Sequence, residues 1–158
     1  MRSVYIETTI PSFYFDERQT PEAIAWKAAT RLWWDSSRHS YRLVTSSFVI
    51  DELEAAPNPK RDHALALLTN VELLDFPEAL ADVIAAYVEN RLVPNDAEGD
   101  AAHLAMTSLH NIDFLLTWNI RHLANANKVQ HLRVINGRLG LFVPTITTPL
   151  TLMPEDAP

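Results

Sequence analysis

Residues 95–122, NDAEGDAAHLAMTSLHNIDFLLTWNIRH, contain the pattern that decides the fold. An acidic turn comes first, and a helix of small and apolar residues is expected to follow from about residue 99. A short apolar strand, 113–117, comes next and ends in a polar turn, 118–122. Because the acidic helix start would lie close to the polar strand end, this stretch predicts a divalent metal site in an α/β protein.

The remainder of the chain repeats this alternation of apolar strands and amphipathic helices. Expected strands are 3–7, 41–45, 71–74, 113–117 and a last short one at 141–144, whereas 132–136 shows only a weak pattern. Expected helices are 20–38, 48–56, 60–69 and 77–91, besides the helix of the central stretch. Strands that alternate with helices predict an α/β fold with a mainly parallel central sheet.

Length and composition limit the class of protein. With 158 residues, the chain is expected to form one domain over 1–148, followed by a C-terminal tail, 149–158. No apolar run reaches the roughly 18 residues that a membrane span requires, and the acidic residue Glu7 comes too early for a signal peptide. The chain has no cysteine, which excludes disulfides and thiolate metal sites. We therefore expect a cytoplasmic protein without a membrane segment.

The net charge of −7 argues against a broad electrostatic contact with nucleic acid, which normally needs a basic surface. It does not exclude a nuclease, because several acids would serve as metal ligands and a bound divalent ion cancels part of their charge. Four basic residues also gather in the last quarter of the chain: Arg121, Lys128, Arg133 and Arg138.

Four polar side chains are expected to converge at one edge of the sheet. Glu7 ends the first strand, and Glu52 follows the second strand by about two helical turns. Asp100 lies in the first turn of the central helix, and Asn119 follows the strand after it. The carboxyl ends of parallel strands share an edge, where open α/β sheets bind their ligands. The sequence therefore predicts that these side chains form one site.

The acidic turn before the central helix has two interpretations. Asp96, Glu98 and Asp100 fall within five residues, and acids at a helix start gain up to about 1 kcal/mol from the helix dipole. Three of them exceed what a cap requires, and a cation would relieve their mutual repulsion. His103, one turn after Asp100, is expected to bind a carboxylate or water next to the ligands rather than the metal itself.

Oxygen ligands without cysteine or paired histidines favour Mg²⁺ or Mn²⁺ over Zn²⁺. The reaction suited to such a site is phosphodiester hydrolysis, in which the metal activates water and stabilises the leaving oxygen. A phosphatase of the aspartate-nucleophile type would need D-x-D-x-T after the first strand, and Glu7-Thr8-Thr9 does not supply it.

The motifs at these positions resemble those of PIN-domain proteins of the VapC toxin type over about residues 3–145. Such proteins begin with a strand that ends in Asp-Thr/Ser-Asn/Ser, which Glu7-Thr8-Thr9 matches here. They carry a glutamate on the helix after the second strand, which Glu52 matches. Their Asp-Ala helix is matched by Asp100–Ala105 and their Thr-x-Asp/Asn strand end by Thr117-Trp118-Asn119. Each motif is short, but the four occur in the same order and at similar spacing.

The resemblance implies a three-layer α/β/α sandwich and a Mg²⁺- or Mn²⁺-dependent endoribonuclease that acts on RNA. It further implies the toxin of a type II toxin–antitoxin module, inhibited by a small antitoxin protein, and a homodimer. Glu7, Glu52 and Asp100 would bind the metal, and Asn119 would occupy the fourth acidic position.

Two positions depart from the family pattern: Glu7 replaces an aspartate and lengthens the side chain, and Asn119 replaces a common aspartate, so that Asp96 becomes a candidate for the missing carboxylate. The alternative hypothesis is a degenerate PIN-like binding or scaffold module without nuclease activity.

Overall fold

The computed structural model describes residues 1–57, 59–94 and 98–155, and in these ranges five strands form one fully parallel sheet in the order β3-β2-β1-β4-β5. The strands are β1 (Ser3–Ile6), β2 (Arg42–Thr45), β3 (Glu72–Leu73), β4 (Phe114–Leu116) and β5 (Thr145–Thr147). The helices are α1 (Thr9–Tyr14), α2 (Pro21–Ser36), α3 (Ser47–Ala55), α4 (Arg61–Leu67), α5 (Leu80–Glu89), α6 (Glu98–Leu109) and α7 (Ala126–Leu139), with a single 3-10 turn, η1 (Arg38–Ser40).

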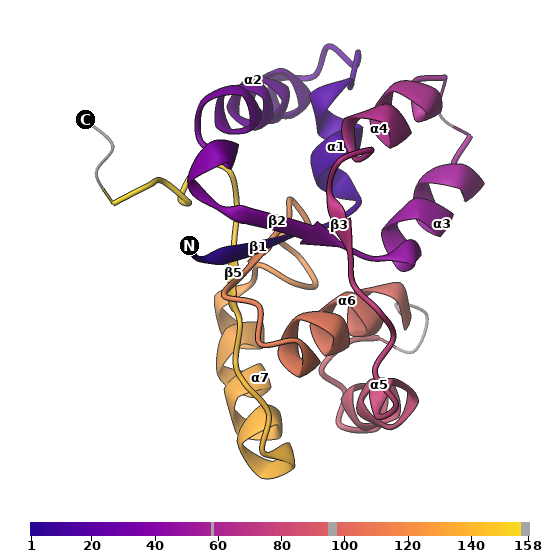
Figure 1. Ribbon diagram of the computed structural model, residues 1–158, viewed down its shortest axis with the longest axis vertical. Coiled ribbons are helices and arrows are strands. Elements are labelled where there is room, and N and C mark those ends of the chain that lie inside the picture. The colour runs from indigo at the N-terminus through magenta and orange to yellow at the C-terminus, as the bar shows by residue number, and fades with distance from the viewer. Residues whose placement is uncertain (58, 95–97, 156–158) are drawn as a thin grey trace.

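Helices cover both faces of the sheet (Figure 1). Helices α1, α2 and α4 lie on one side of β1 and β2, and α5, α6 and α7 lie on the other. Helix α3 lies beyond the carboxyl end of β2 and contacts both α4 and α6. This arrangement confirms the predicted α/β fold with a parallel sheet between two helical layers.

The central strands are buried because both of their faces are covered. Val4, Tyr5 and Ile6 of β1 and Leu115 and Leu116 of β4 are fully buried. Uninterrupted apolar runs of this kind are typical of parallel strands packed between two helical layers. The apolar cores of the two layers therefore meet at β1 and β4.

Local sequence signals place the ends of the helices. The Thr20 hydroxyl accepts a hydrogen bond from the amide of Ala23, and proline at position 21 opens α2. Helix α7 starts after Asn125, whose side chain caps it, and ends at Gly140 in the left-handed conformation with φ 70°. No helix in the described ranges has both the length and the apolar character that spanning a bilayer requires.

The prediction of a last strand at 141–144 is wrong. The strand β5 begins at Thr145, whose amide donates to the carbonyl of Asp113 next to β4. Pro144 has no N–H to donate, so the ladder starts only after it. Sequence analysis also gave no helix at 9–14, where α1 forms, and only a weak pattern at 132–136, which lies inside α7.

The order of the strands fixes where a ligand can approach. From β1 the chain moves first to β2 and β3 on one side, and later to β4 and β5 on the other. The connections therefore reverse direction between β1 and β4, and in open α/β sheets the crevice at such a reversal is the usual ligand site. The segments that follow β1 and β4 contain Glu7 and Asn119.

A buried polar network joins α5, α6 and α7. The Tyr87 hydroxyl lies 2.6 Å from Asn136 Oδ1, and Asn136 Nδ2 donates to Ser108 Oγ and to the carbonyl of Phe142. All three side chains are buried. Because an unsatisfied buried acceptor loses its hydration without compensation, this network ties the three helices together.

We expect Tyr87→Phe to lower the free energy of unfolding by about 1–3 kcal/mol, because it leaves Asn136 Oδ1 without its donor. Urea unfolding followed by circular dichroism measures the change. The matched control is Tyr14→Phe, which removes an exposed hydroxyl bonded to Asp35 and should shift stability by no more than about 0.5 kcal/mol. Equal losses in the two variants would contradict this role of the network.

Candidate metal centre

Glu7, directly after β1, is a carboxylate with one satisfied and one open oxygen. Its Oε2 accepts hydrogen bonds from Thr9 N at 3.0 Å, Thr9 Oγ1 at 2.5 Å and Thr117 Oγ1 at 2.8 Å. No described residue donates a hydrogen bond to Oε1. Glu7 is only 3% exposed, and burial raises the pKa of its carboxyl above the usual value. A buried carboxylate with an open oxygen is stabilised by a nearby cation.

Glu52 reaches the same space from the middle of α3. Its Oε2 accepts a hydrogen bond from Thr8 Oγ1 at 2.9 Å, and its Oε1 lies 2.7 Å from His103 Nε2. Partial burial raises the pKa of the Glu52 carboxyl, but the hydrogen bond and charge of His103 outweigh it, and the net shift is downward. Its side chain is 39% exposed, so Glu52 has room to move.

Gly99 makes the approach of Glu52 to α6 feasible. A Cβ atom at position 99 would lie 3.2 Å from Glu52 Oε1, closer than ordinary packing allows. The missing side chain therefore leaves room for the carboxylate beside the first turn of α6, where the helix dipole favours negative charge.

His103 lies at the centre of a buried chain of hydrogen bonds. Its Nδ1 is 2.8 Å from the Tyr5 hydroxyl, which in turn lies 2.6 Å from Ser46 Oγ. The ring is 1% exposed. Burial lowers the pKa of His103. The hydrogen bond to Glu52 and the negative charges of Glu7, Glu52 and Asp100 raise this pKa by more than burial lowers it, so the net shift is upward. The surrounding carboxylates therefore favour a positive charge at this position.

Asp100, in the first turn of α6, is held by the turn that follows β4. Asn119 Nδ2 donates to Asp100 Oδ1 at 3.1 Å, and His122 Nδ1 lies 3.1 Å from Asp100 Oδ2. Asn119 Oδ1 itself accepts from the amide of His122. Burial raises the pKa of the Asp100 carboxyl, and the opposing effects of His122 and His103 do not cancel this shift. Asn119 thus turns its amide nitrogen, not its oxygen, toward Asp100.

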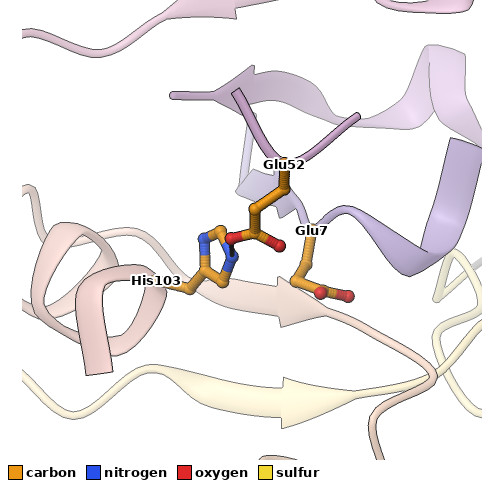
Figure 2. A group of neighbouring side chains, drawn as sticks. All are labelled: Glu7, Glu52 and His103. Carbon is orange, nitrogen blue, oxygen red and sulfur yellow. Dashed lines mark hydrogen bonds and ion pairs between the residues drawn. The ribbon is translucent and has the colours of Figure 1, made fainter. Parts of the chain in front are cut away.

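The ligand atoms of Glu7, Glu52 and His103 all lie within 4.8 Å of one another (Figure 2). Two ligands of one divalent ion, each bound at about 2.0–2.2 Å, are at most about 4.4 Å apart. Small side-chain movements would therefore let this cluster hold a cation. Asp100 lies outside the cluster. Its negative charge nevertheless raises the pKa of His103, and the charge of Glu52 raises the pKa of the Asp100 carboxyl.

The structure thus brings Glu7 and Glu52 together and places Asp100 with Asn119 beside them. Asp96, named as a substitute ligand, lies outside the described residues. His103, which was expected next to the ligands, has a ring nitrogen among the possible ligand atoms.

Thr8, Thr9 and Thr117 belong to the motifs found in the sequence, but they were given no role there, and His122 was not singled out. In the structure Thr9 and Thr117 hold Glu7, Thr8 holds Glu52, and His122 contacts Asp100. Their common signal is a polar side chain within about six residues after the end of a central strand.

Aromatic packing holds the end of β4 near α1 and α2. The ring of Trp118 stacks on Trp26 at 4.7 Å between centroids and 9° between planes, and Phe13 meets the edge of both. The Trp118 amide donates to Thr9 Oγ1, and its indole N–H donates to Thr30 Oγ1. Thr9 therefore links the Glu7 carboxylate to the turn that carries Asn119.

A hollow of about 790 Å³ lies elsewhere, among α2, the start of β4 and the C-terminal segment. It is lined mainly by apolar side chains, including those of Leu32, Trp33, Tyr41, Phe114 and Leu150. None of the clustered carboxylates contributes to its lining, so it plays no part in the candidate metal centre.

No family model and no curated protein sequence matches the chain. Among the solved structures that match, two cover almost the whole length of the chain. The structure of VapBC2 from Rickettsia felis, bound to a DNA fragment from their promoter, has a TM-score of 0.51 and 13% identity, and covers 92% of this chain and 98% of its own. The structure of FitAcB from Neisseria gonorrhoeae has a TM-score of 0.54 and 15% identity, over 94% and 99%. The likeness shows a shared fold, which is the PIN-like α/β/α sandwich that the sequence motifs predicted.

Proposed function

We propose that the chain is a Mg²⁺- or Mn²⁺-dependent endoribonuclease that hydrolyses RNA phosphodiester bonds, with Glu7, Glu52 and Asp100 as its metal-binding carboxylates. The observation that carries the proposal is that Glu7 and Glu52 meet in one cluster beyond β1 and β2, with Asp100 near enough for the charge of Glu52 to act on its carboxyl. Gathering partly buried carboxylates is costly unless a cation compensates their charge.

The donor set fits a divalent ion of this kind. The open Oε1 of Glu7 and the movable carboxylate of Glu52 offer the oxygen ligands that Mg²⁺ and Mn²⁺ prefer. When bound, such an ion supplies an activated water and stabilises negative charge on the phosphoryl and leaving oxygens. It also reduces the repulsion between an acidic protein and a polyanionic substrate.

The chain's own residues would fix the acids in place. Thr9 and Thr117 hold one oxygen of Glu7 and leave the other free. Asn119 and His122 hold Asp100 from the opposite side. Carboxylates that are already fixed need little reorganisation during the reaction. Holding charged groups in position in this way is the protein's main contribution to phosphodiester hydrolysis at a metal site.

We also propose that the protein acts as the toxin of a type II module, bound by a small antitoxin protein and forming a homodimer. Support comes from the fold shared with VapBC2, which its structure shows bound to a promoter DNA fragment. Induced expression of the wild-type chain in a bacterial host should then arrest growth, and Asp100→Asn should relieve the arrest at equal protein level. Arrest by both proteins alike would contradict a nuclease toxin.

The direct test of the nuclease is cleavage of structured RNAs by the purified protein. We expect internal cuts with Mn²⁺ or Mg²⁺ and none after removal of the metal with EDTA. A DNA of the same sequence, incubated under the same conditions, tests whether the protein cleaves RNA in preference to DNA. Binding of Mn²⁺ without cleavage of any RNA would instead favour the degenerate binding or scaffold module.

Replacing His122 by phenylalanine should weaken Mn²⁺ binding by about 10–100-fold, the usual cost of removing a group that orients a metal ligand. His122 Nδ1 contacts Asp100 Oδ2, and phenylalanine has no nitrogen to replace this contact, so the carboxylate is no longer held. Calorimetric titration measures the effect, with the exposed His39→Phe as the matched control. Unchanged affinity in His122→Phe would exclude this positioning role.

A further inference from the structure

We propose that His103 Nε2 is a nitrogen ligand of the bound ion and gives the site a preference for Mn²⁺ over Mg²⁺. This inference rests on the proposed metal-dependent function. It adds one imidazole nitrogen to a donor set that was expected to consist of oxygen atoms alone. The geometry that supports it is a ring nitrogen of His103 within 4.8 Å of a carboxylate oxygen of both Glu7 and Glu52, with Nε2 lying 2.7 Å from Glu52 Oε1.

The distances allow Nε2 and a carboxylate oxygen to share one ion. Glu52 Oε1 and His103 Nε2 are 2.7 Å apart. Adjacent ligands at right angles, each bound at about 2.1 Å, lie about 3.0 Å apart. The pair therefore needs to open by a few tenths of an ångström, which the half-exposed Glu52 side chain permits. Binding of the ion requires Nε2 to be unprotonated, so any proton between Nε2 and Glu52 would leave to solvent.

The other ring nitrogen, Nδ1, has an oxygen partner, as the second nitrogen of metal-binding histidines usually does. These residues donate their second N–H to a fixed oxygen, which sets the tautomer and the ring orientation. Here Nδ1 lies 2.8 Å from the Tyr5 hydroxyl, which in turn lies 2.6 Å from Ser46 Oγ. Burial raises the pKa of Tyr5, so its hydroxyl stays neutral and can accept this bond. Nε2 is thereby directed toward the carboxylates.

Helix α6 supplies both Asp100 and His103, three residues apart and so on one face. The ring is surrounded by the negative charges of Glu7, Glu52 and Asp100, which also favour a cation there. Imidazole binds transition metals better than it binds Mg²⁺, whose ligands are almost all oxygens. A histidine in the set therefore shifts the preference toward Mn²⁺.

Electron spin-echo spectroscopy of the Mn²⁺-loaded full-length protein tests the ligand directly, because a bound imidazole gives a ¹⁴N modulation. We expect the modulation in the wild type and in His122→Phe at saturating Mn²⁺, and its loss in His103→Gln. Labelling all histidines with ¹⁵N should replace the ¹⁴N signal by a ¹⁵N coupling. By calorimetry, His103→Gln should lose about 10–100-fold in Mn²⁺ affinity and less in Mg²⁺ affinity.

Should His103→Gln fail to fold, the ¹⁵N-labelled His122→Phe protein decides, because in the described ranges only His103 and His122 form hydrogen bonds with Glu52 or Asp100. A retained coupling supports His103, and a lost coupling overturns it. Mn²⁺ binding without nitrogen modulation in the wild type overturns the inference and leaves the proposed nuclease intact. Absence of Mn²⁺ binding overturns both.

Discussion

Replacing Asp100 by asparagine will reduce Mn²⁺-dependent RNA cleavage by on the order of 100-fold or more, because it removes one negative charge from the metal site. The substitution preserves shape and leaves one oxygen to accept from Asn119. The new amide group would face His122 Nδ1, with which it can form a hydrogen bond if that nitrogen is unprotonated. The fold should therefore persist while the chemistry is lost.

Single-turnover cleavage of an RNA that the wild type cuts gives the size of this effect. The matched control is Asp51→Asn, which changes an exposed acid on α3 next to Glu52. We expect it to cleave at the wild-type rate. Asp100→Asn with undiminished cleavage, and with a melting temperature equal to that of the wild type, would remove Asp100 from the site.

Replacing Glu7 by glutamine should abolish high-affinity Mn²⁺ binding without loss of stability. A glutamine oxygen can accept the three hydrogen bonds that Thr9 and Thr117 donate, so its NH₂ group would replace the open Oε1. That group repels a cation. We expect the affinity for Mn²⁺ to fall by more than the ~10–100-fold that loss of an orienting group costs.

The melting temperature of Glu7→Gln, measured in EDTA so that no metal is bound, shows whether Glu7 stabilises the fold. Burial raises the pKa of the Glu7 carboxyl, which means that the ionised form destabilises the folded, metal-free protein near neutral pH. A neutral replacement of the same shape should therefore keep or raise the melting temperature. Glu54→Gln, an exposed change on α3, serves as control and should alter neither property. A large drop in melting temperature for Glu7→Gln would show that Glu7 is a structural group.

Much of the fold was predictable because the signals were local. The continuous apolar runs of β1 and β4 imply burial on both faces, and a sheet buried on both faces implies parallel strands with a shared carboxyl edge. That argument alone brought Glu7, Glu52 and Asp100 toward one place. The later start of β5 was missed because the apolar residues before Pro144 look like a strand, while the residues that pair with β5 lie on β4.

The orientation of the site could not be predicted, because it depends on contacts between distant segments. Nothing near His103 in sequence indicates that Tyr5 and Ser46 lie behind its ring. Similarly, the space that Gly99 leaves for Glu52 joins residues on different helices. Spacing along the chain identifies acids that can meet, but the nitrogen atom among them emerges only from the packed structure.

The central claim is that the acids at this edge of the sheet form a divalent metal site. Titration of Mn²⁺ into the metal-free wild-type protein, followed by calorimetry, tests it most directly. We predict saturable binding that Glu7→Gln abolishes and Glu54→Gln preserves. Heats no larger than dilution for the folded wild-type protein would contradict the account.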